Sequence, residues 1–328
     1  MTAPPTMRIA VLGVGGIGGL LAARLAETAA DIILLARGET AAALAIDGLH
    51  LEQSDSVRSH HHADRFEIID TSGVPGTRQA AVPVDIAFIC GKSADTASLA
   101  GYASELLNGS GFALSLQNGL GHADLLARHL GAQRVLDGST LHGATRLGPN
   151  QVRWAGVGRI DLGWHTPPDG EGRPADPADM DARCERLVQL LDEAGLRPVW
   201  QSDMRSVIWQ KLLLNIAINP LAAICGVENG AILTSTDLLE QARSTLAEGV
   251  LVARAEGVVV DEQRMVERLE EVLAATADNR CSMLQDVMAG RPTEIDALCG
   301  EVARRGEALG IPTPRNAQLL ALVEGIGH

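Results

Sequence analysis

A glycine-rich turn near the amino terminus constrains the fold more than any other feature of the sequence. The segment Gly13–Gly18 (GVGGIG) follows the hydrophobic run Arg8–Leu12 and precedes an Ala- and Leu-rich run at 19–30. A GxGxxG turn between strand and helix needs a tight bend at the first glycine, close ligand approach at the second and close helix packing at the third. The helix amino terminus then presents unpaired N–H groups to an anion. The turn therefore predicts a Rossmann-type domain that binds the pyrophosphate of a dinucleotide.

The residue after the second predicted strand distinguishes the two common dinucleotides. Strand 31–36 is followed by Arg37, and no acidic residue occurs before Glu39. A site for NAD normally carries Asp or Glu here to bind the ribose 2′-hydroxyl, whereas a guanidinium suits a 2′-phosphate. Lys92, after the predicted strand 84–90, could supply a second positive charge. The pattern favours NADP(H), with a solvated strand-end arginine as the alternative reading of Arg37.

The remaining hydrophobic pattern divides the chain into two parts. Short apolar runs that include 84–90 and 111–116 alternate with helical segments, which is typical of a parallel sheet with crossover helices. After Asp203 we expect only helices, at 204–225, 235–256, 261–289, 293–309 and 315–325. The sequence thus predicts an α/β protein with an N-terminal Rossmann-type NADP-binding domain, 1–200, and an all-α domain, 201–328.

Three segments of the first part are expected to interrupt this alternation. Residues 50–82 are polar and read as an irregular loop, in which His60, His61 and His62 are expected to be solvated. Three adjacent histidines cannot share one face of a strand or helix, so no metal site is predicted there. Alternation over 140–164 predicts a hairpin that extends the sheet. The Pro- and Asp-rich segment 166–180 reads as an exposed loop.

Composition excludes several classes of function. Lys and Arg number 27 and Asp and Glu 41, giving a net charge of −14, and aromatic residues make up only 2%. Such a chain is unsuited to nucleic acid or anionic lipid as its main partner. Five widely spaced cysteines without a CxxC pair fit a reducing compartment. No uninterrupted apolar stretch reaches the roughly 18 residues of a membrane span, so we expect a cytoplasmic protein.

A polar face on an otherwise apolar helix marks the second part. Lys211, Asn215 and Asn219 follow one another at intervals of four within the apolar segment 205–225, so they lie on one helical face. We expect this helix, including Lys211, to be buried. Buried Lys and Asn side chains need polar partners, so the face lines either a ligand cavity or a purely structural network. Desolvation would also make the lysine a usable proton donor near neutral pH.

Two further polar residues are ambiguous on physical grounds alone. Glu294 begins the predicted helix 293–309, where a carboxylate often only complements the helix dipole. The alternative is that Glu294 is the partner of Lys211. Ser282 lies within the predicted helix 261–289 and has no assigned role from its spacing.

The motifs together resemble those of the ketopantoate reductase (2-dehydropantoate 2-reductase) family. In chain order they are Gly13–Gly18, Lys92, Leu116–Gly119, Trp209–Asn215, Ile218–Leu221, Asn229–Gly230, Ser282–Asp286, Gly290–Asp296 and Gly310–Asn316. The likeness runs nearly from end to end, and many separate motifs in one order are more specific than any single one.

The resemblance implies an enzyme that reduces ketopantoate to (R)-pantoate with NADPH, on the path to pantothenate. It implies that Lys211 protonates the developing alkoxide and that Glu294 orients the substrate and this lysine. The implied substrate-binding residues are Asn118, Asn215, Asn219, Asn229 and Ser282. The expected cofactor-binding residues are Gly13, Gly15, Gly16, Ile17, Gly18, Arg37, Lys92 and Asn118.

Some residues depart from the family pattern and leave alternatives open. Cys281 stands where a second serine is common, Cys299 where asparagine is usual, and Gly91 where a larger residue is common before Lys92. The alternatives to a ketopantoate reductase are a paralogous NADP-dependent reductase of another small 2-oxo acid and a non-catalytic NADP-binding sensor. The apolar helical part makes a homodimer plausible.

Overall fold

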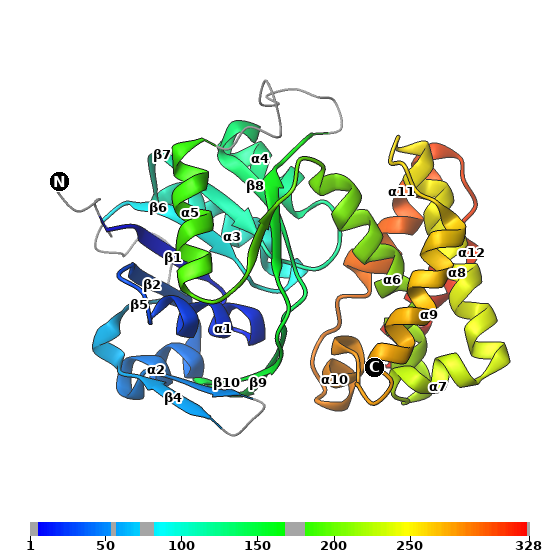
Figure 1. Ribbon diagram of the computed structural model, residues 1–328, viewed down its shortest axis with the longest axis horizontal. Coiled ribbons are helices and arrows are strands. Elements are labelled where there is room, and N and C mark those ends of the chain that lie inside the picture. The colour runs from blue at the N-terminus through cyan, green and yellow to red at the C-terminus, as the bar shows by residue number, and fades with distance from the viewer. Residues whose placement is uncertain (1–5, 54–56, 73–81, 168–180, 327–328) are drawn as a thin grey trace. The chain divides into compact units, whose positions relative to one another are not determined.

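The computed structural model describes residues 6–53, 57–72, 82–167 and 181–326. The chain divides into two compact units, of which unit 1 contains 1–117 and 122–204. Unit 2 contains 118–121 and 205–328. Figure 1 shows strands and helices in the first and helices in the second.

An eight-stranded sheet forms the centre of unit 1. Its strands, in chain order, are β1 (Arg8–Leu12), β2 (Asp31–Ala36), β5 (Phe66–Asp70), β6 (Val84–Ile89), β7 (Leu107–Ser115), β8 (Val135–Thr140), β11 (Ile160–Trp164) and β12 (Pro198–Trp200). Their spatial order is β12-β11-β8-β7-β6-β1-β2-β5, and the pairs from β5 through β8 are all parallel. This confirms the predicted strands 8–12, 31–36, 84–90 and 111–116 and the predicted α/β fold class.

Both faces of this sheet are covered, as in other parallel sheets. Along β1, Ile9 and Val11 belong to one apolar cluster and Ala10 and Leu12 to the other. The helices of unit 1 are α1 (Gly16–Leu25), α2 (Gly38–Asp47), α3 (Thr96–Leu106), α4 (His122–Leu130) and α5 (Ala182–Glu193). Because the central strands are buried on both faces, their apolar residues follow one another without alternating with polar ones.

A second, four-stranded sheet corrects two expectations from the sequence. Its strands are β3 (Leu49–Gln53), β4 (Arg58–His61), β9 (Gly143–Gly148) and β10 (Gln151–Gly156), in the order β4-β3-β10-β9. The segment 50–82 is thus not an irregular loop throughout, because it contains most of β3 and all of β4 and β5, and Leu51 is almost fully buried. The predicted hairpin exists as β9 and β10, but it joins this second sheet instead of extending the first. Most of the predicted loop 166–180 lies outside the described residues.

A buried histidine connects three elements of unit 1. His165, directly after β11, is 5% exposed and lies between two carboxylates. Its Nδ1 is 2.8 Å from Oδ2 of Asp137 on β8, and its Nε2 is 3.2 Å from Oδ1 of Asp124 on α4. Burial by itself would lower the pKa of His165, but the two carboxylates raise it to about 9. The imidazole is therefore charged at neutral pH and stabilises the junction of these elements.

Unit 2 consists of helices around one apolar cluster. They are α6 (Met204–Cys225), α7 (Asn229–Thr234), α8 (Thr236–Ala255), α9 (Glu262–Ala275), α10 (Ser282–Met288), a π-helix (Asp296–Gly300), α11 (Glu301–Leu309) and α12 (Pro314–Ile326). The predicted helix 261–289 is two helices, because the chain turns at 276–281 between α9 and α10. The predicted helix 293–309 begins with the π-helix. The all-α character of the second part is confirmed.

Helix α6 runs through the core of unit 2 and carries Trp209, Leu213 and Ile216 into its apolar cluster. In the part of the chain that the structure describes, α6 alone meets the length and hydropathy of a membrane-crossing helix. Inside the protein, 61% of its most apolar window is buried. A core helix of this length and composition shows the same property.

Candidate active site

The glycine turn of unit 1 has the geometry that its spacing predicts. Gly13 has φ +97°, and its N–H donates to the carbonyl oxygen of Leu35 at 3.1 Å. A Cβ on Gly18 would lie 2.0 Å from the Gly13 carbonyl oxygen, so no larger residue fits there. A Cβ on Gly15, in contrast, would meet no atom within 4 Å. The turn is therefore tightly packed against the protein at Gly18, whereas space for a ligand remains beside Gly15.

The amino terminus of α1 suits an anionic group. Gly15 is the residue before the helix, no side chain caps the first turn, and that turn contains no acidic residue. The leading N–H groups and the helix dipole thus favour a pyrophosphate at this position. Gly16 has a packing role as well, because its Cβ would lie 2.6 Å from the carbonyl oxygen of Ala144 on β9. The residues present fit a bound dinucleotide.

The two predicted cationic residues follow the carboxyl ends of β2 and β6, the strands on either side of β1. Arg37 directly follows β2, and its exposed guanidinium is 3.0 Å from Oδ2 of Asp95. Asp95 belongs to the short turn that Lys92 precedes, and Lys92 is also exposed. The structure therefore brings Arg37 next to the segment that carries Lys92, with both side chains accessible to a ligand.

A small pocket in unit 2 contains four of the residues predicted to bind substrate or to act on it. It encloses about 200 Å³, part of it open to solvent. Its lining residues are Asn118, Asn219, Ser282, Met283, Asp286, Glu294 and Leu298. The pocket thus joins the loop 118–121, α6, α10 and the start of the π-helix.

The loop 118–121 is held tightly against the π-helix. The Asn118 side-chain amide donates to Oε2 of Glu294 at 3.1 Å. Gly119 has φ +100°, and a Cβ there would lie 2.4 Å from the carbonyl oxygen of Ala297. Leu120 packs on the apolar cluster of unit 2. Close backbone contact therefore fixes where Asn118 meets Glu294.

The polar face of α6 is only partly as expected. Asn219 is 8% exposed and lines the pocket, whereas Lys211 and Asn215 are half-buried and do not line it. The expectation that Lys211 is buried is therefore wrong. The spacing of four still places all three side chains on one face of α6.

Helix α10 presents Ser282 to the pocket through an unusual cap. Cys281 precedes the helix, and its Sγ accepts from the N–H of Leu284 at 3.4 Å. The same thiol donates to the carbonyl oxygen of Asn219 at 3.6 Å. The pKa of Cys281 is raised by burial, which keeps the thiol protonated. Cysteine here performs the capping role of a serine and connects α10 to α6.

Asp286 is a lining residue to which sequence reasoning gave no role. It is 6% exposed, and its Oδ1 is 3.0 Å from Nε of Arg291. Its position four residues after Ser282, on the same face of α10, is the signal that could have identified it.

Asn229 lies at the start of α7 and does not line the pocket. Its Nδ2 donates to Oγ1 of Thr276 at 2.9 Å, and the residue is 7% exposed. The structure therefore does not bring Asn229 together with Asn118, Asn219, Ser282 and Glu294.

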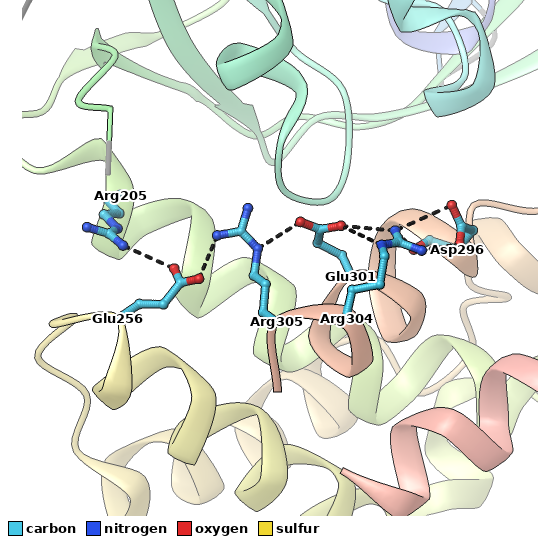
Figure 2. A network of polar contacts seen from close by, with 6 residues as sticks. All are labelled: Arg205, Glu256, Asp296, Glu301, Arg304 and Arg305. Atoms are coloured by element: carbon cyan, nitrogen blue, oxygen red, sulfur yellow. Dashed lines mark hydrogen bonds and ion pairs between the residues drawn. The ribbon is translucent and has the colours of Figure 1, made fainter. Parts of the chain in front are cut away.

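A chain of ion pairs between six side chains crosses unit 2 and includes the first residue of the π-helix, Asp296 (Figure 2). Its members, in spatial order, are Arg205, Glu256, Arg305, Glu301, Arg304 and Asp296. Nε of Arg305 is 2.7 Å from Oε1 of Glu301, and its Nη1 is 2.7 Å from Oε1 of Glu256. A Cβ on Gly121 would lie 3.6 Å from Oε1 of Glu301. The ion pairs thus connect α6, the residue that ends α8, α11 and the π-helix, and Glu301 lies next to Gly121 of the loop.

Comparison with known proteins identifies the family. The signature described as ketopantoate reductase PanE/ApbA matches residues 9–167, and its C-terminal counterpart matches 203–327. A 2-dehydropantoate 2-reductase of Halobacterium salinarum is 34% identical over 97% of this chain and 98% of its own.

Solved structures agree with this result. A PanE/ApbA family ketopantoate reductase from Ralstonia eutropha has a TM-score of 0.83 and 30% identity, with 98% of each chain covered. D-mandelate dehydrogenase in a ternary complex with NADH and anilino(oxo)acetate has a TM-score of 0.86 and 22% identity, also over 98% of each chain. At that identity the second similarity shows the fold alone. The two signatures and the full-length relative show that this chain belongs to the ketopantoate reductase PanE/ApbA family.

Proposed function

We propose that this protein reduces the ketone of 2-dehydropantoate to (R)-pantoate with NADPH, a step in pantothenate biosynthesis. The observation that carries the proposal is the pocket in which Asn118 and Glu294 are joined beside Asn219 and Ser282. Full-length relatives named 2-dehydropantoate 2-reductase support the same substrate.

The cofactor residues are those of unit 1 together with Asn118. The proposed pyrophosphate site is formed by Gly13, Gly15, Gly16, Ile17 and Gly18. Arg37 and Lys92 hold the 2′-phosphate, where a planar guanidinium and an ammonium both suit the charge. NADPH, when bound, supplies the hydride that the ketone carbon receives.

The chain itself supplies the proton and the orientation of the substrate. Reduction of a ketone leaves an alkoxide, so a donor must lie within hydrogen-bond reach of that oxygen. Lys211 is the only basic residue between Val207 and Cys225, and we assign it this role. Glu294 orients the substrate and Lys211, while Asn118 holds the carboxylate of Glu294.

The remaining polar residues bind the substrate in this proposal. Asn215, Asn219, Asn229 and Ser282 carry amide and hydroxyl groups that can bond to the hydroxyl, carbonyl and carboxylate oxygens of a small 2-oxo acid. For Asn229, which lies outside the pocket lining, the family pattern alone supports the assignment.

Following NADPH absorbance with a panel of 2-oxo acids tests the proposal. We expect 2-dehydropantoate to give the highest kcat/KM. Faster turnover of another 2-oxo acid would instead identify a paralogous reductase. NADPH binding without turnover of any member of the panel would identify a sensor.

Two further properties belong to the proposal. All five cysteines are free thiols, which fits a cytoplasmic enzyme. A homodimer formed through the helices of unit 2, where Leu251 and Leu322 are exposed, is the second property. Light scattering across a concentration series would measure the oligomeric state.

A further inference from the structure

Three potential metal ligands gather at one edge of the second sheet. Asp47 ends α2, His50 lies on β3 and His60 on β4, and α2 and β4 can be followed in Figure 1. His50 and His60 are direct partners across the antiparallel strand pair, so their side chains project from the same face. One ligand atom of each of the three residues lies within 4.8 Å of the other two.

Both imidazoles turn the same nitrogen towards Asp47. Nε2 of His50 is 2.6 Å from Oδ2 of Asp47, and Nε2 of His60 is 3.6 Å from Oδ1 and 2.5 Å from the backbone oxygen. The two rings stack with centroids 4.2 Å apart and an interplanar angle of 1°. Two nitrogen ligand atoms and one oxygen ligand atom therefore gather around Asp47, and rotation of the parallel rings out of their stack would direct both nitrogen atoms at one ion.

The spacing suits a four-coordinate ion. Zinc ligands lie about 2.0–2.2 Å from the metal, which puts tetrahedral donors roughly 3.3 Å apart. The three ligand atoms lie within 4.8 Å of one another, so each separation has to change by no more than about 1.5 Å to reach this value. The fourth position faces solvent, because Asp47 and His60 are exposed.

The backbone beneath the three ligands is already fixed. Gly48, with φ +75°, makes the turn from α2 to β3, and a Cβ there would lie 2.0 Å from the carbonyl oxygen of His61. Asn150 is 7% exposed, and its Nδ2 donates to the Gly48 carbonyl oxygen at 2.8 Å and to Oδ2 of Asp47 at 3.4 Å. Such supporting bonds orient the ligands of protein metal sites.

We propose that Asp47, His50 and His60 bind one divalent transition-metal ion, of which zinc is the best fit, with water as the fourth ligand. The ion joins the end of α2 to strands β3 and β4. The sequence predicted a solvated loop for the histidines at 60–62. His60 is exposed, but it lies on β4 opposite His50 and not in a loop.

The site is separate from the residues assigned to reduction. Arg37 precedes α2 and Asp47 ends it, and a helix of ten residues is about 15 Å long. The ion therefore stabilises this edge of unit 1 and leaves NADPH binding unchanged.

Isothermal titration of the full chain with zinc chloride tests the proposal. We expect one site in the wild type. Loss of a group that only supports a metal ligand weakens metal binding roughly 10–100-fold. His50→Ala and His60→Ala each remove a ligand itself, so each should weaken zinc binding by more than this. Asp47→Asn, which keeps the side-chain shape, should weaken it as well. His129→Ala, which removes an exposed histidine of α4 outside the site, should bind zinc like the wild type.

Two more measurements use the same proteins. Zinc should raise the Tm of the wild type and of His129→Ala, but not of His50→Ala or His60→Ala. The cobalt(II) complex should lack the thiolate charge-transfer absorption that binding at the exposed Cys225 would produce. Circular dichroism without metal establishes that the variants are folded. Absence of zinc binding to the wild type, unchanged binding in both histidine variants, or a thiolate band would each overturn the proposal.

Discussion

The amide of Asn118 donates to the Glu294 carboxylate at 3.1 Å, although 176 positions of sequence separate the two residues. Both side chains are half-buried and line the same pocket. A carboxylate accepts hydrogen bonds and donates none, so this contact leaves its other oxygen positions to a cationic or hydroxyl partner.

Glu294→Gln keeps the shape of the side chain and removes its charge. We expect kcat for 2-dehydropantoate to fall by roughly 10-fold or more, since a hydrogen bond to a charged group contributes about 1.5–3 kcal/mol. NADPH affinity and Tm should stay near the wild-type values. Glu324→Gln, at an exposed position of α12, is the control. If Glu294→Gln has the kcat and the KM of the wild type, Glu294 only complements a helix dipole.

Lys211→Ala should lower kcat by roughly 10²–10⁴-fold, because the proton donor is lost. Lys211→Arg keeps the positive charge, but a guanidinium does not release its proton near neutral pH, so kcat should stay low. NADPH titration should give near-wild-type affinity for both variants.

The melting temperature distinguishes this role from a structural one. Lys211 is half-buried, so its removal should change Tm little. A large drop in Tm would mean that the lysine mainly satisfies the polar face of α6. Near-wild-type turnover of Lys211→Ala would rule it out as the acid.

Gly119→Ala places a methyl group 2.4 Å from the Ala297 carbonyl oxygen, at a residue with φ +100°. Unfolding free energy should fall by about 1–3 kcal/mol or more, and turnover should fall as Asn118 moves away from Glu294. Gly121→Ala is a matched control, with φ +81° but no atom closer than 3.6 Å. It carries the backbone strain without the clash, so its turnover should remain closer to wild type. Equal loss of turnover in both variants would contradict the steric explanation.

Arg37→Ala should reduce the preference for NADPH over NADH by roughly ten-fold or more, because a charge-assisted contact to the 2′-phosphate is lost. Fluorescence titration of both cofactors measures it. Arg58→Ala, which removes another exposed arginine of unit 1, should keep the preference. Equal affinities of the wild type for the two cofactors would refute the phosphate site.

The pH dependence of stability should report on His165. Its pKa is raised to about 9 in the folded protein, above the ordinary value of 6.5. The folded state therefore holds the proton more tightly. The stabilisation is complete below pH 6.5 and is lost as the pH rises through about 9. Urea denaturation between pH 6.5 and about 9 measures the free energy of unfolding of the wild type and of His165→Gln. The difference between the two proteins should become smaller as the pH rises. Parallel curves would mean that Asp124 and Asp137 do not hold a charged imidazole.

Local signals predicted much of the fold. The geometry of the turn Gly13–Gly18 depends only on the strand before it and the helix after it, so the spacing of its glycines predicted that geometry. The strands at 49–53, 58–61 and 66–70 were missed because each is short and the second is His-rich. The first and third also pair with strands distant in sequence, β10 and β2. Likewise, the π-helix has only five residues, which are too few to show a period different from that of an α-helix in the apolar pattern of 293–309.

The candidate site, like the fold, was predicted only in part from the sequence. The residues Asn118, Asn219, Ser282 and Glu294 were identified through family motifs, and the structure gathers them in one pocket. Spacing alone could not show that Asn229 lies apart, or that Lys211 is half-buried. Both depend on how α7 and α6 pack, which is a long-range property.

The loop 118–121 belongs to unit 2 although β7 and α4, on either side of it, belong to unit 1. The chain therefore changes unit after Gln117, after Gly121 and again after Met204. A fragment that starts at Arg205 would lack both Leu120 and the amide partner of Glu294. A chimera joined only at 204 would combine the loop of one homologue with the π-helix of another. The backbone of Gly119 packs so closely on Ala297 that even a Cβ would clash, so a mismatch there is not tolerated. Recombination between family members must transfer these four residues together with the C-terminal segment.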